Sequence, residues 1–198
     1  MDEKRGWRYF HCQVCDLVYR DPVTYLNKVE EKARYETHNN SIENTGYVRF
    51  LTPVVELLKP YLRTSDKGLD YGCGPGPILK ILFSNFGFEI ENYDPYFFND
   101  LKLLEKKYNF ITCTEAIEHF YESGEGLNKM VDLLEKDGFL LLMTDRRPSK
   151  EKFLSWGYRM DNTHVCFYST KTFEWIAHHW NLELVYSEGK LSLFRKKF

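Results

Sequence analysis

A glycine-rich turn constrains the fold of this chain more than any other feature of its sequence. Gly72, Gly74 and Gly76 follow a short predicted strand at 67–71 and precede a predicted helix at 77–86. Proline at the first helical position suits this start, because the backbone N–H that it lacks would have no partner there. Closely spaced glycines let a ligand approach the backbone at the end of a strand. The turn therefore predicts an α/β domain with a ligand site at one edge of its sheet.

The rest of the chain alternates between strand and helix patterns. Further strands are predicted at 88–93, 110–113 and 139–143, and further helices at 101–107, 126–135 and 172–180. This alternation indicates a mostly parallel sheet with helices on both faces. Two apolar segments at 182–186 and 191–194 flank a turn-like sequence and predict an antiparallel last strand. The expected fold class is therefore α/β.

Length and composition limit the domain organisation. With 198 residues, of which 43% are hydrophobic, the chain has room for one α/β domain and a small appendage. We expect an appendage at 1–25 and a main domain at 26–198, which opens with two helices, at 26–40 and 47–62.

Charge and hydropathy indicate the expected partners and location. The formal net charge of −2 shows no basic excess that would favour nucleic acid or an anionic membrane. The chain also has no apparent signal peptide or membrane span. We therefore expect a cytoplasmic protein with a small-molecule substrate, no nucleic-acid partner and no membrane partner. The sequence gives no indication of the oligomeric state.

A carboxylate follows the glycine turn at the spacing typical of nucleotide sites. Asp94 ends the strand at 88–93 and precedes Pro95, where a carboxylate can accept hydrogen bonds from both ribose hydroxyls. Pro77 stands where a dinucleotide fingerprint has its third glycine, which disfavours a pyrophosphate ligand. A dehydrogenase would also need a second mononucleotide-binding half, for which the chain has no room. Alternatively, the glycines form only a tight turn and Asp94 is an ordinary strand-end residue.

These motifs resemble those of class I S-adenosylmethionine (SAM) methyltransferases. Residues 70–76 are similar to the first motif of that family, 93–95 to the second, and 137–140 to the start of the fifth strand. The resemblance spans 66–194 and implies a Rossmann-like methyltransferase fold with SAM as cofactor. It also implies methyl transfer to an acceptor by in-line displacement. The short segment 95–113 departs from the family and predicts a shortened third strand and helix.

The resemblance also implies roles for individual residues. Gly72 and Gly74 would contact SAM, Asp70 would support the loop from the strand end, and Asp94 would bind the ribose. Two asparagines before the second helix could cap that helix or cover the amino-acid end of SAM. The full set of expected cofactor residues is Asp70, Tyr71, Gly72, Cys73, Gly74, Asp94, Pro95, Thr114, Glu115, Asn39 and Asn40.

Candidate catalytic residues follow the strand at 110–113. If a helix begins near Glu115, then Glu115 and His119 lie four residues apart on one face of it. An imidazole oriented by a carboxylate is a suitable general base near neutral pH. The alternative is that Glu115 only starts the helix and His119 only packs beside the cofactor.

A second polar and aromatic cluster occupies the loop at 156–168. Its polar side chains could form the wall of a substrate site, or the loop could be anchored by buried aromatic residues with its histidine bonded to the backbone. Both interpretations remain open. The candidate substrate residues are Arg159, Asp161, His164 and Tyr168.

A cysteine pair near the N-terminus completes the candidate sites. Together with the site segments above, it resembles a bacterial subgroup of methyltransferases that often begins with a zinc-binding region. Cys12 and Cys15 resemble the second half of a zinc ribbon, whereas structural zinc requires four ligands. We expect a metal-free remnant; the alternative is a zinc site completed by His11 or by another chain.

Two functions are consistent with the sequence. The first is an enzyme that methylates a small molecule, and the intact glycine turn and Asp94 favour it. The second is a SAM-binding regulatory or protein-interaction module without its own catalysis. The acceptor is not identified by any motif.

Overall fold

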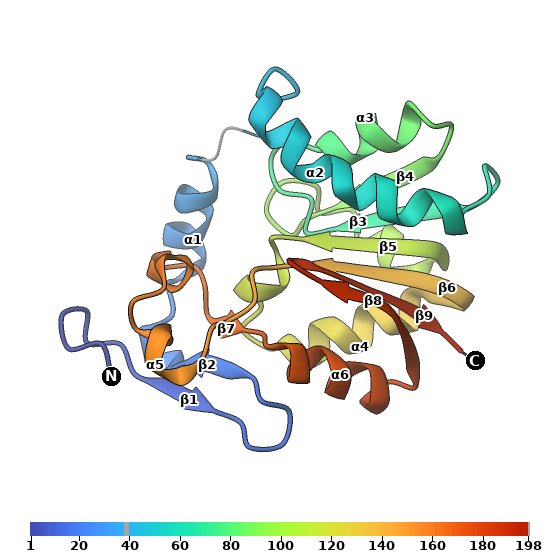
Figure 1. Ribbon diagram of the computed structural model, residues 1–198. Coiled ribbons are helices and arrows are strands. Elements are labelled where there is room, and N and C mark those ends of the chain that lie inside the picture. The colour runs from blue at the N-terminus through green and yellow to red at the C-terminus, as the bar shows by residue number, and fades with distance from the viewer. Residues whose placement is uncertain (38–39, 198) are drawn as a thin grey trace.

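The computed structural model describes residues 1–37 and 40–197. Its centre is a six-stranded sheet with the strand order β4-β3-β5-β6-β9-β8 (Figure 1). The bounds of these strands are β3 Lys67–Tyr71, β4 Glu89–Tyr93, β5 Tyr108–Thr114, β6 Leu134–Met143, β8 Leu182–Glu188 and β9 Leu191–Lys196.

The strand directions confirm the predicted fold class. Strand β3 pairs in parallel with β4 and β5, and β5 pairs in parallel with β6. Strand β9 is antiparallel to both β6 and β8. The carboxyl ends of four parallel strands therefore meet at one edge of the sheet, where ligands of such folds bind.

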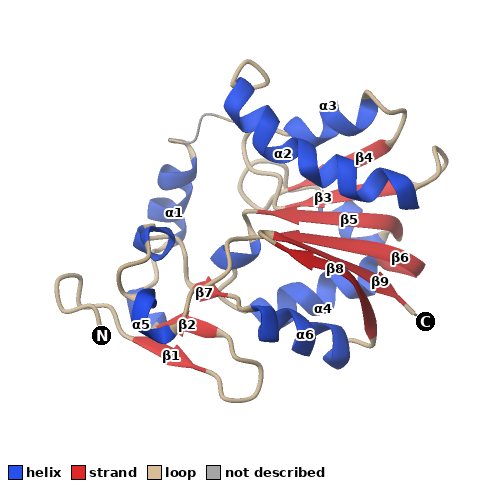
Figure 2. Cartoon of the chain, viewed as in Figure 1, coloured by secondary structure: helices blue, strands red, loops and turns tan. Residues whose placement is uncertain are grey.

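Helices cover both faces of the sheet. Helices α2 (Thr45–Leu58) and α3 (Ile78–Ser84) lie on one face, and α4 (Ser123–Leu133) and α6 (Thr170–His179) lie on the other (Figure 2). On the first face, the buried side chains of α2 and α3 pack with Phe110 and Leu141 of the sheet. Burial on two faces explains the continuous hydrophobic run that ends β6, from Phe139 to Met143.

The segment between β4 and β5 is shorter than a helical crossover. It contains a 3-10 helix at Leu101–Glu105 where the sequence predicts an α-helix at 101–107. The Asp100 side chain caps this turn by accepting from the amide of Lys102. Because β5 begins at Tyr108, there is no length left for a longer helix, and β4 forms one edge of the sheet.

The N-terminal segment is part of a second, smaller sheet. Strands β1 (Tyr9–His11), β2 (Val18–Arg20) and β7 (Cys166–Phe167) pair in the order β1-β2-β7. The fully buried Arg20 donates through Nη2 to the carbonyl of Asn162, 2.8 Å away. The sequence predicts no strands here, because β1 and β2 have only three residues each and β7, the second partner of β2, lies far along the chain.

The remaining elements are short helices. Helix α1 (Lys28–Tyr35) is shorter than the predicted 26–40 and begins with a capping box between Asn27 and Glu30. The others are α5 (Lys150–Phe153) and 3-10 helices at Pro22–Thr24, Lys59–Tyr61, Ile117–His119 and Gly157–Met160. No helix in the described parts of the chain is long and apolar enough to cross a membrane.

Candidate active site

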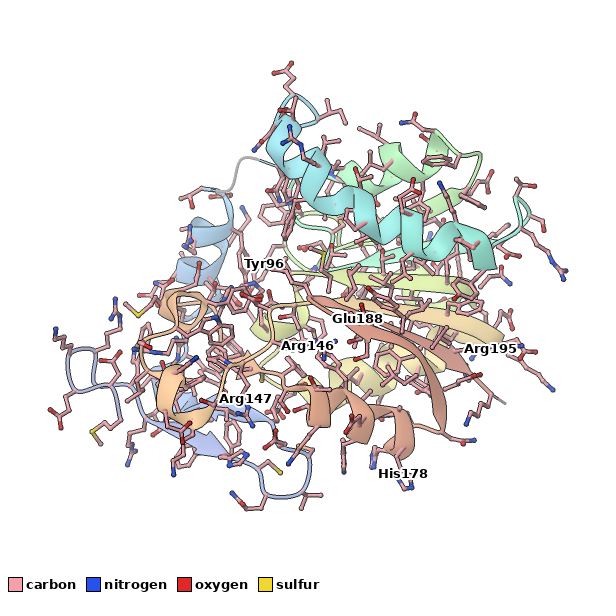
Figure 3. The ribbon with its side chains drawn as sticks, viewed as in Figure 1. Tyr96, Arg146, Arg147, His178, Glu188 and Arg195 are labelled. Carbon is pink, nitrogen blue, oxygen red and sulfur yellow. The ribbon has the colours of Figure 1, made fainter. Side chains whose placement is uncertain are left out.

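A cavity of about 620 Å³ lies at the carboxyl edge of the sheet, within the size range of small-molecule sites. The glycine turn after β3 and the ends of β4 and β5 form its base, and α1 covers it from outside. Tyr96, which follows β4, lies between α1 and the sheet in Figure 3. Polar side chains lining the cavity include Glu31, Asn40, Asp70, Asp94, Tyr96, Thr114, Glu115, His119 and His164.

The glycine turn requires residues without a side chain. Gly72 and Gly74 have φ angles of +79° and +64°, which L-residues rarely adopt. A Cβ atom at Gly76 would lie 1.8 Å from the carbonyl oxygen of Asn40. The turn is therefore packed tightly against Asn40, which precedes α2.

Asp94 connects this turn to the loop after β4. Its Oδ2 accepts a hydrogen bond from the amide of Gly74, at 3.0 Å. Its Oδ1 accepts from the amides of Tyr96 and Phe97, at 2.8 and 3.2 Å. One carboxylate therefore holds both walls of this end of the cavity in position.

Asp70 lies beneath the turn, almost fully buried at the end of β3. Thr112 of β5 donates a hydrogen bond to its Oδ1 at 2.8 Å. Burial, with a smaller contribution from Asp94, raises the pKa of Asp70 to about 7.

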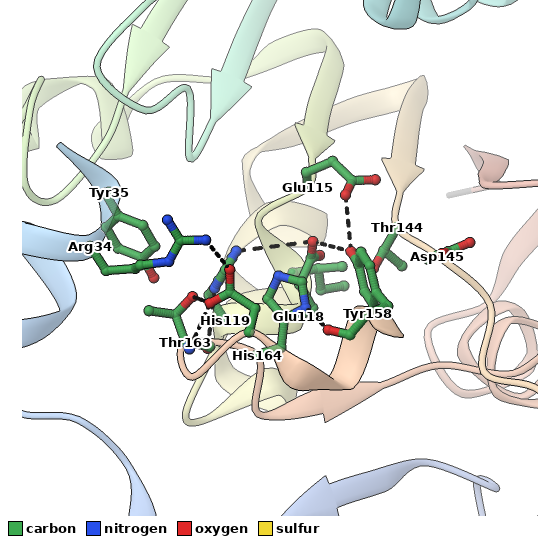
Figure 4. A network of polar contacts seen from close by, with 12 residues as sticks. Arg34, Tyr35, Glu115, Glu118, His119, Thr144, Asp145, Tyr158, Thr163 and His164 are labelled. Carbon is green, nitrogen blue, oxygen red and sulfur yellow. Dashed lines mark hydrogen bonds and ion pairs between the residues drawn. The ribbon is translucent and has the colours of Figure 1, made fainter. Parts of the chain in front are cut away.

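A cluster of acids and one tyrosine lies where the loop after β6 meets the end of β5 (Figure 4). The hydroxyl of Tyr158 hydrogen-bonds to Glu118 and lies 3.1 Å from Oε2 of Glu115. Lys190 Nζ lies 3.5 Å from Oε1 of Glu115. Burial raises the pKa of both carboxyl groups to about 7. We call the part of the cavity that Glu115, His119 and His164 line the distal end.

Two histidines complete the distal end, with ring centroids 4.7 Å apart. Nδ1 of His119 lies 3.1 Å from the carbonyl of Thr163, and Nδ1 of His164 lies 2.7 Å from the carbonyl of Tyr158. Burial lowers the pKa of His119, and it lowers that of His164 to about 3. Both imidazoles are therefore neutral at physiological pH.

Comparison with known families decides what kind of protein has this cavity. A sequence model of the family described as "Methyltransferase domain" matches residues 43–187. The chain belongs to this methyltransferase family. A search of curated protein sequences found no match.

Solved structures with the same fold are distant in sequence. An O-methyltransferase family protein from Burkholderia thailandensis is 13% identical with a TM-score of 0.58, and the match covers 84% of this chain and 62% of that protein. The 1,6-didemethyltoxoflavin-N1-methyltransferase of the same organism is 12% identical with a TM-score of 0.58, and the match covers 97% and 99% of the two chains. The N-methyltransferase NodS from Bradyrhizobium japonicum is 15% identical with a TM-score of 0.56, and the match covers 87% and 98%. At these sequence identities, the structural similarity establishes that the proteins share a fold.

The structure brings most predicted cofactor residues of this methyltransferase to one cavity. Tyr71 is the exception among those described, because its ring turns away and packs against Tyr93 and Phe120. Asn39 lies outside the described residues. The residues that line the cavity are Asp70, Gly72, Cys73, Gly74, Asp94, Pro95, Thr114, Glu115 and Asn40.

The expected helix face with Glu115 and His119 does not exist. The amide of Glu115 donates to the carbonyl of Met143 at 2.7 Å and so continues the pairing of β5 with β6. Glu115 then takes a φ of +47°, and only a 3-10 turn follows at Ile117–His119. The carboxylate nearest to His119 is instead Glu118, with Oε1 4.0 Å from Nε2.

Three of the four candidate substrate residues do not line the cavity. Arg159 is buried against the N-terminal segment, with Nη1 2.7 Å from Oδ2 of Asp2. The hydroxyl of Tyr168 is buried and donates to the carbonyl of Ile117 at 3.1 Å. Asp161 forms an ion pair with Arg34 at 2.5 Å. His164 is the candidate that reaches the cavity, and it also bonds to the backbone, so both interpretations of this loop apply in part.

Several site residues were not predicted. Glu31 of α1 is buried and accepts hydrogen bonds from Tyr35 and Tyr96, which joins α1 to the loop after β4. Glu118 and Tyr158 lie within segments that the sequence singles out, yet no spacing rule pairs them. Their pairing depends on the path of the loop after β6.

The cysteine pair lies in the turn between β1 and β2. The amide of Cys12 donates to the carbonyl of Leu17, and the amide of Asp16 donates to the carbonyl of Cys12. Hydrogen bonds from the amides of Cys15 and Val14 lower the pKa of the Cys12 thiol. The expectation that this pair is a metal-free remnant stays a prediction.

Proposed function

We propose that this methyltransferase transfers the methyl group of SAM to a small-molecule acceptor bound at the distal end of the cavity. One observation carries the proposal: a single cavity extends from the glycine turn and Asp94 to the two histidines. A donor held at the first end would present its methyl group toward the second.

The residues at the first end fit the chemistry of SAM. Gly72 and Gly74 leave backbone space beside the turn, and Asp94 supplies carboxylate oxygens for ribose hydroxyls. Aromatic side chains from Tyr96 and Phe97 line the cavity beside Asp94 and offer an apolar surface for the adenine. When bound, SAM supplies an activated methyl group for in-line displacement.

The protein contributes alignment, exclusion of water and a proton acceptor where the acceptor requires one. Helix α1 covers the cavity through Glu31 and Tyr35, which limits access of water. Neutral His119 is a candidate proton acceptor, because its depressed pKa leaves an unprotonated ring nitrogen at physiological pH.

Similar structures support a small acceptor. The Burkholderia N1-methyltransferase has 1,6-didemethyltoxoflavin and S-adenosylhomocysteine bound, and NodS has S-adenosylhomocysteine bound. A cavity of about 620 Å³ suits molecules of this size. The cytoplasmic location and the lack of a nucleic-acid partner remain predictions from sequence.

Calorimetry with SAM and with S-adenosylhomocysteine tests the first part of the proposal. We expect saturable binding of both, and absence of binding to either would contradict it. A screen of small-molecule acceptors, followed by S-adenosylhomocysteine release, tests the second part. Binding without turnover across a broad screen would favour a SAM-binding regulatory module instead.

A further inference from the structure

Three side chains suited to metal binding converge at the distal end of the cavity. Glu118, His119 and His164 each offer one ligand atom, and these atoms lie within 4.8 Å of one another. They come from the 3-10 turn after β5 and from the loop before β7, as Figure 4 shows. The donor set is thus two imidazoles and one carboxylate.

The backbone orients both imidazoles for this role. Each Nδ1 lies within hydrogen-bond distance of a backbone carbonyl, which can only accept, so Nδ1 carries the ring proton. In a neutral imidazole this leaves the lone pair on Nε2. Histidines that bind metals usually donate their other ring N–H to a carbonyl or carboxylate in this way. The tautomers of His119 and His164 are therefore those that a metal site requires.

One oxygen of the Glu118 carboxylate accepts no hydrogen bond from the described residues. Glu118 is fully buried, and its Oε2 has no hydrogen-bond partner among residues 1–37 and 40–197. Its other oxygen accepts from Tyr158, which fixes the orientation of the group. A buried oxygen without a partner is costly, and a cation beside it would remove that cost.

We propose that Glu118, His119 and His164 bind a divalent metal ion such as Zn²⁺. Two histidines and one glutamate form a common ligand set of catalytic zinc, which keeps one position open. Ligands at about 2.0–2.1 Å from a tetrahedral ion lie about 3.3 Å apart, so side-chain movements of about 1 Å close the site. The open position faces the cavity, because both histidines line it.

The ion would hold an oxygen or nitrogen atom of the methyl acceptor at the distal end. This part rests on the proposed function, whereas metal binding does not. It also gives His119 a role other than proton acceptor, since its lone pair would be directed to the ion. The acceptor class is then one with a metal-binding hydroxyl, carboxylate or amine group.

Zinc titration of the full chain, without SAM or acceptor, tests the metal site. The variant used for this titration carries no histidine tag. It has the changes Cys12→Ser and Cys15→Ser, so that the cysteine turn cannot bind the ion. After treatment with a chelator, we expect one Zn²⁺ to bind per chain in calorimetry. Glu118→Gln and His164→Asn should each raise the Kd for Zn²⁺ at least about tenfold.

A matched control is His178→Asn, which changes an exposed histidine on α6 and should leave the Kd unchanged. Circular dichroism establishes that each variant is folded. Absence of saturable Zn²⁺ binding to the folded Cys12→Ser, Cys15→Ser protein would overturn the proposal. Equal Kd values in all variants would also overturn it.

The visible spectrum of Co²⁺ bound to the unsubstituted chain provides a test that needs no variant. Bands of nitrogen and oxygen ligation, distinct from thiolate charge transfer, would support the site. Thiolate ligation alone would assign the ion to Cys12 and Cys15 and reject the site at Glu118. SAM calorimetry is a separate measurement, so failure of the metal site and failure of the SAM proposal are distinguishable.

Discussion

The Asp94 carboxylate accepts a hydrogen bond from the amide of Gly74, with 3.0 Å between Oδ2 and the nitrogen. This contact links the ends of two neighbouring parallel strands, β3 and β4, at the base of the cavity. Asp94 therefore shapes the turn and also offers its oxygens to a ligand.

Replacing Asp94 by alanine should weaken binding of SAM. Each lost hydrogen bond to the charged group costs about 1.5–3 kcal/mol, which raises the Kd about 10- to 150-fold. Calorimetry on the folded variant measures this. Asp66→Ala is a matched control, because Asp66 also caps a turn, through the amide of Arg63, but away from the cavity. An unchanged Kd in Asp94→Ala would refute the ribose role.

Replacing Gly76 by alanine should destabilise the protein. Its Cβ would lie 1.8 Å from the carbonyl oxygen of Asn40, so the backbone near Asn40 must move. Such overpacking costs about 1–3 kcal/mol of the free energy of unfolding, measured by urea denaturation. Gly157→Ala is the control, since a Cβ there meets no atom within 4 Å. Equal stability of the two variants would contradict the tight packing of the turn.

The free energy of unfolding of the ligand-free protein should decrease as pH rises, because of Asp70. Burial raises the pKa of this carboxyl from 3.8 to about 7 on folding, so the folded state binds the proton more tightly. The stabilisation is fully present below pH 3.8 and is lost as pH rises through 7. Asp70→Asn removes this loss.

The measurement is the difference in unfolding free energy between Asp70→Asn and the unchanged protein, followed against pH. It should shift in favour of the variant by up to about 1.4 kcal/mol per pH unit between these two pKa values. Thr112→Val removes the hydrogen bond that favours the charged form of Asp70. It should therefore raise the pKa of Asp70 further and extend the pH range over which stability is lost to higher pH. A difference that is constant with pH would rule out a buried, titrating Asp70.

Arg159→Met should lower thermal stability without changing binding of S-adenosylhomocysteine. Arg159 is buried and donates to the carbonyls of Phe153 and Leu154, outside the cavity. A loss of about 1–2 kcal/mol corresponds to a fall of about 2–8 °C in the Tm of a chain of this size. The control is Arg195→Met, because Arg195 forms a surface ion pair with Asp137. Figure 3 shows the position of Arg195. Weaker ligand binding with an unchanged Tm would instead support a substrate role for Arg159.

Local patterns in the sequence predicted the centre of the fold and the first end of the cavity. Strand and helix periods are visible in neighbouring residues, and glycine is the residue that accepts the positive φ angles found at positions 72 and 74. Asp94 was predicted because parallel strands bring their carboxyl ends together. The prediction of a helix beginning at Glu115 was wrong, because the amide of Glu115 continues the sheet by donating to the carbonyl of Met143.

The distal end was decided by contacts between residues far apart in the chain. Glu118 meets Tyr158, and His119 meets His164, only because the loop after β6 returns across the end of β5. Likewise, β2 pairs with β7 through Val18 and Phe167. The sequence by itself determined the α/β centre and the glycine turn with its acid, because neighbouring residues encode them. Only the tertiary structure decided the buried cluster and the small sheet, because these depend on how the whole chain closes and packs.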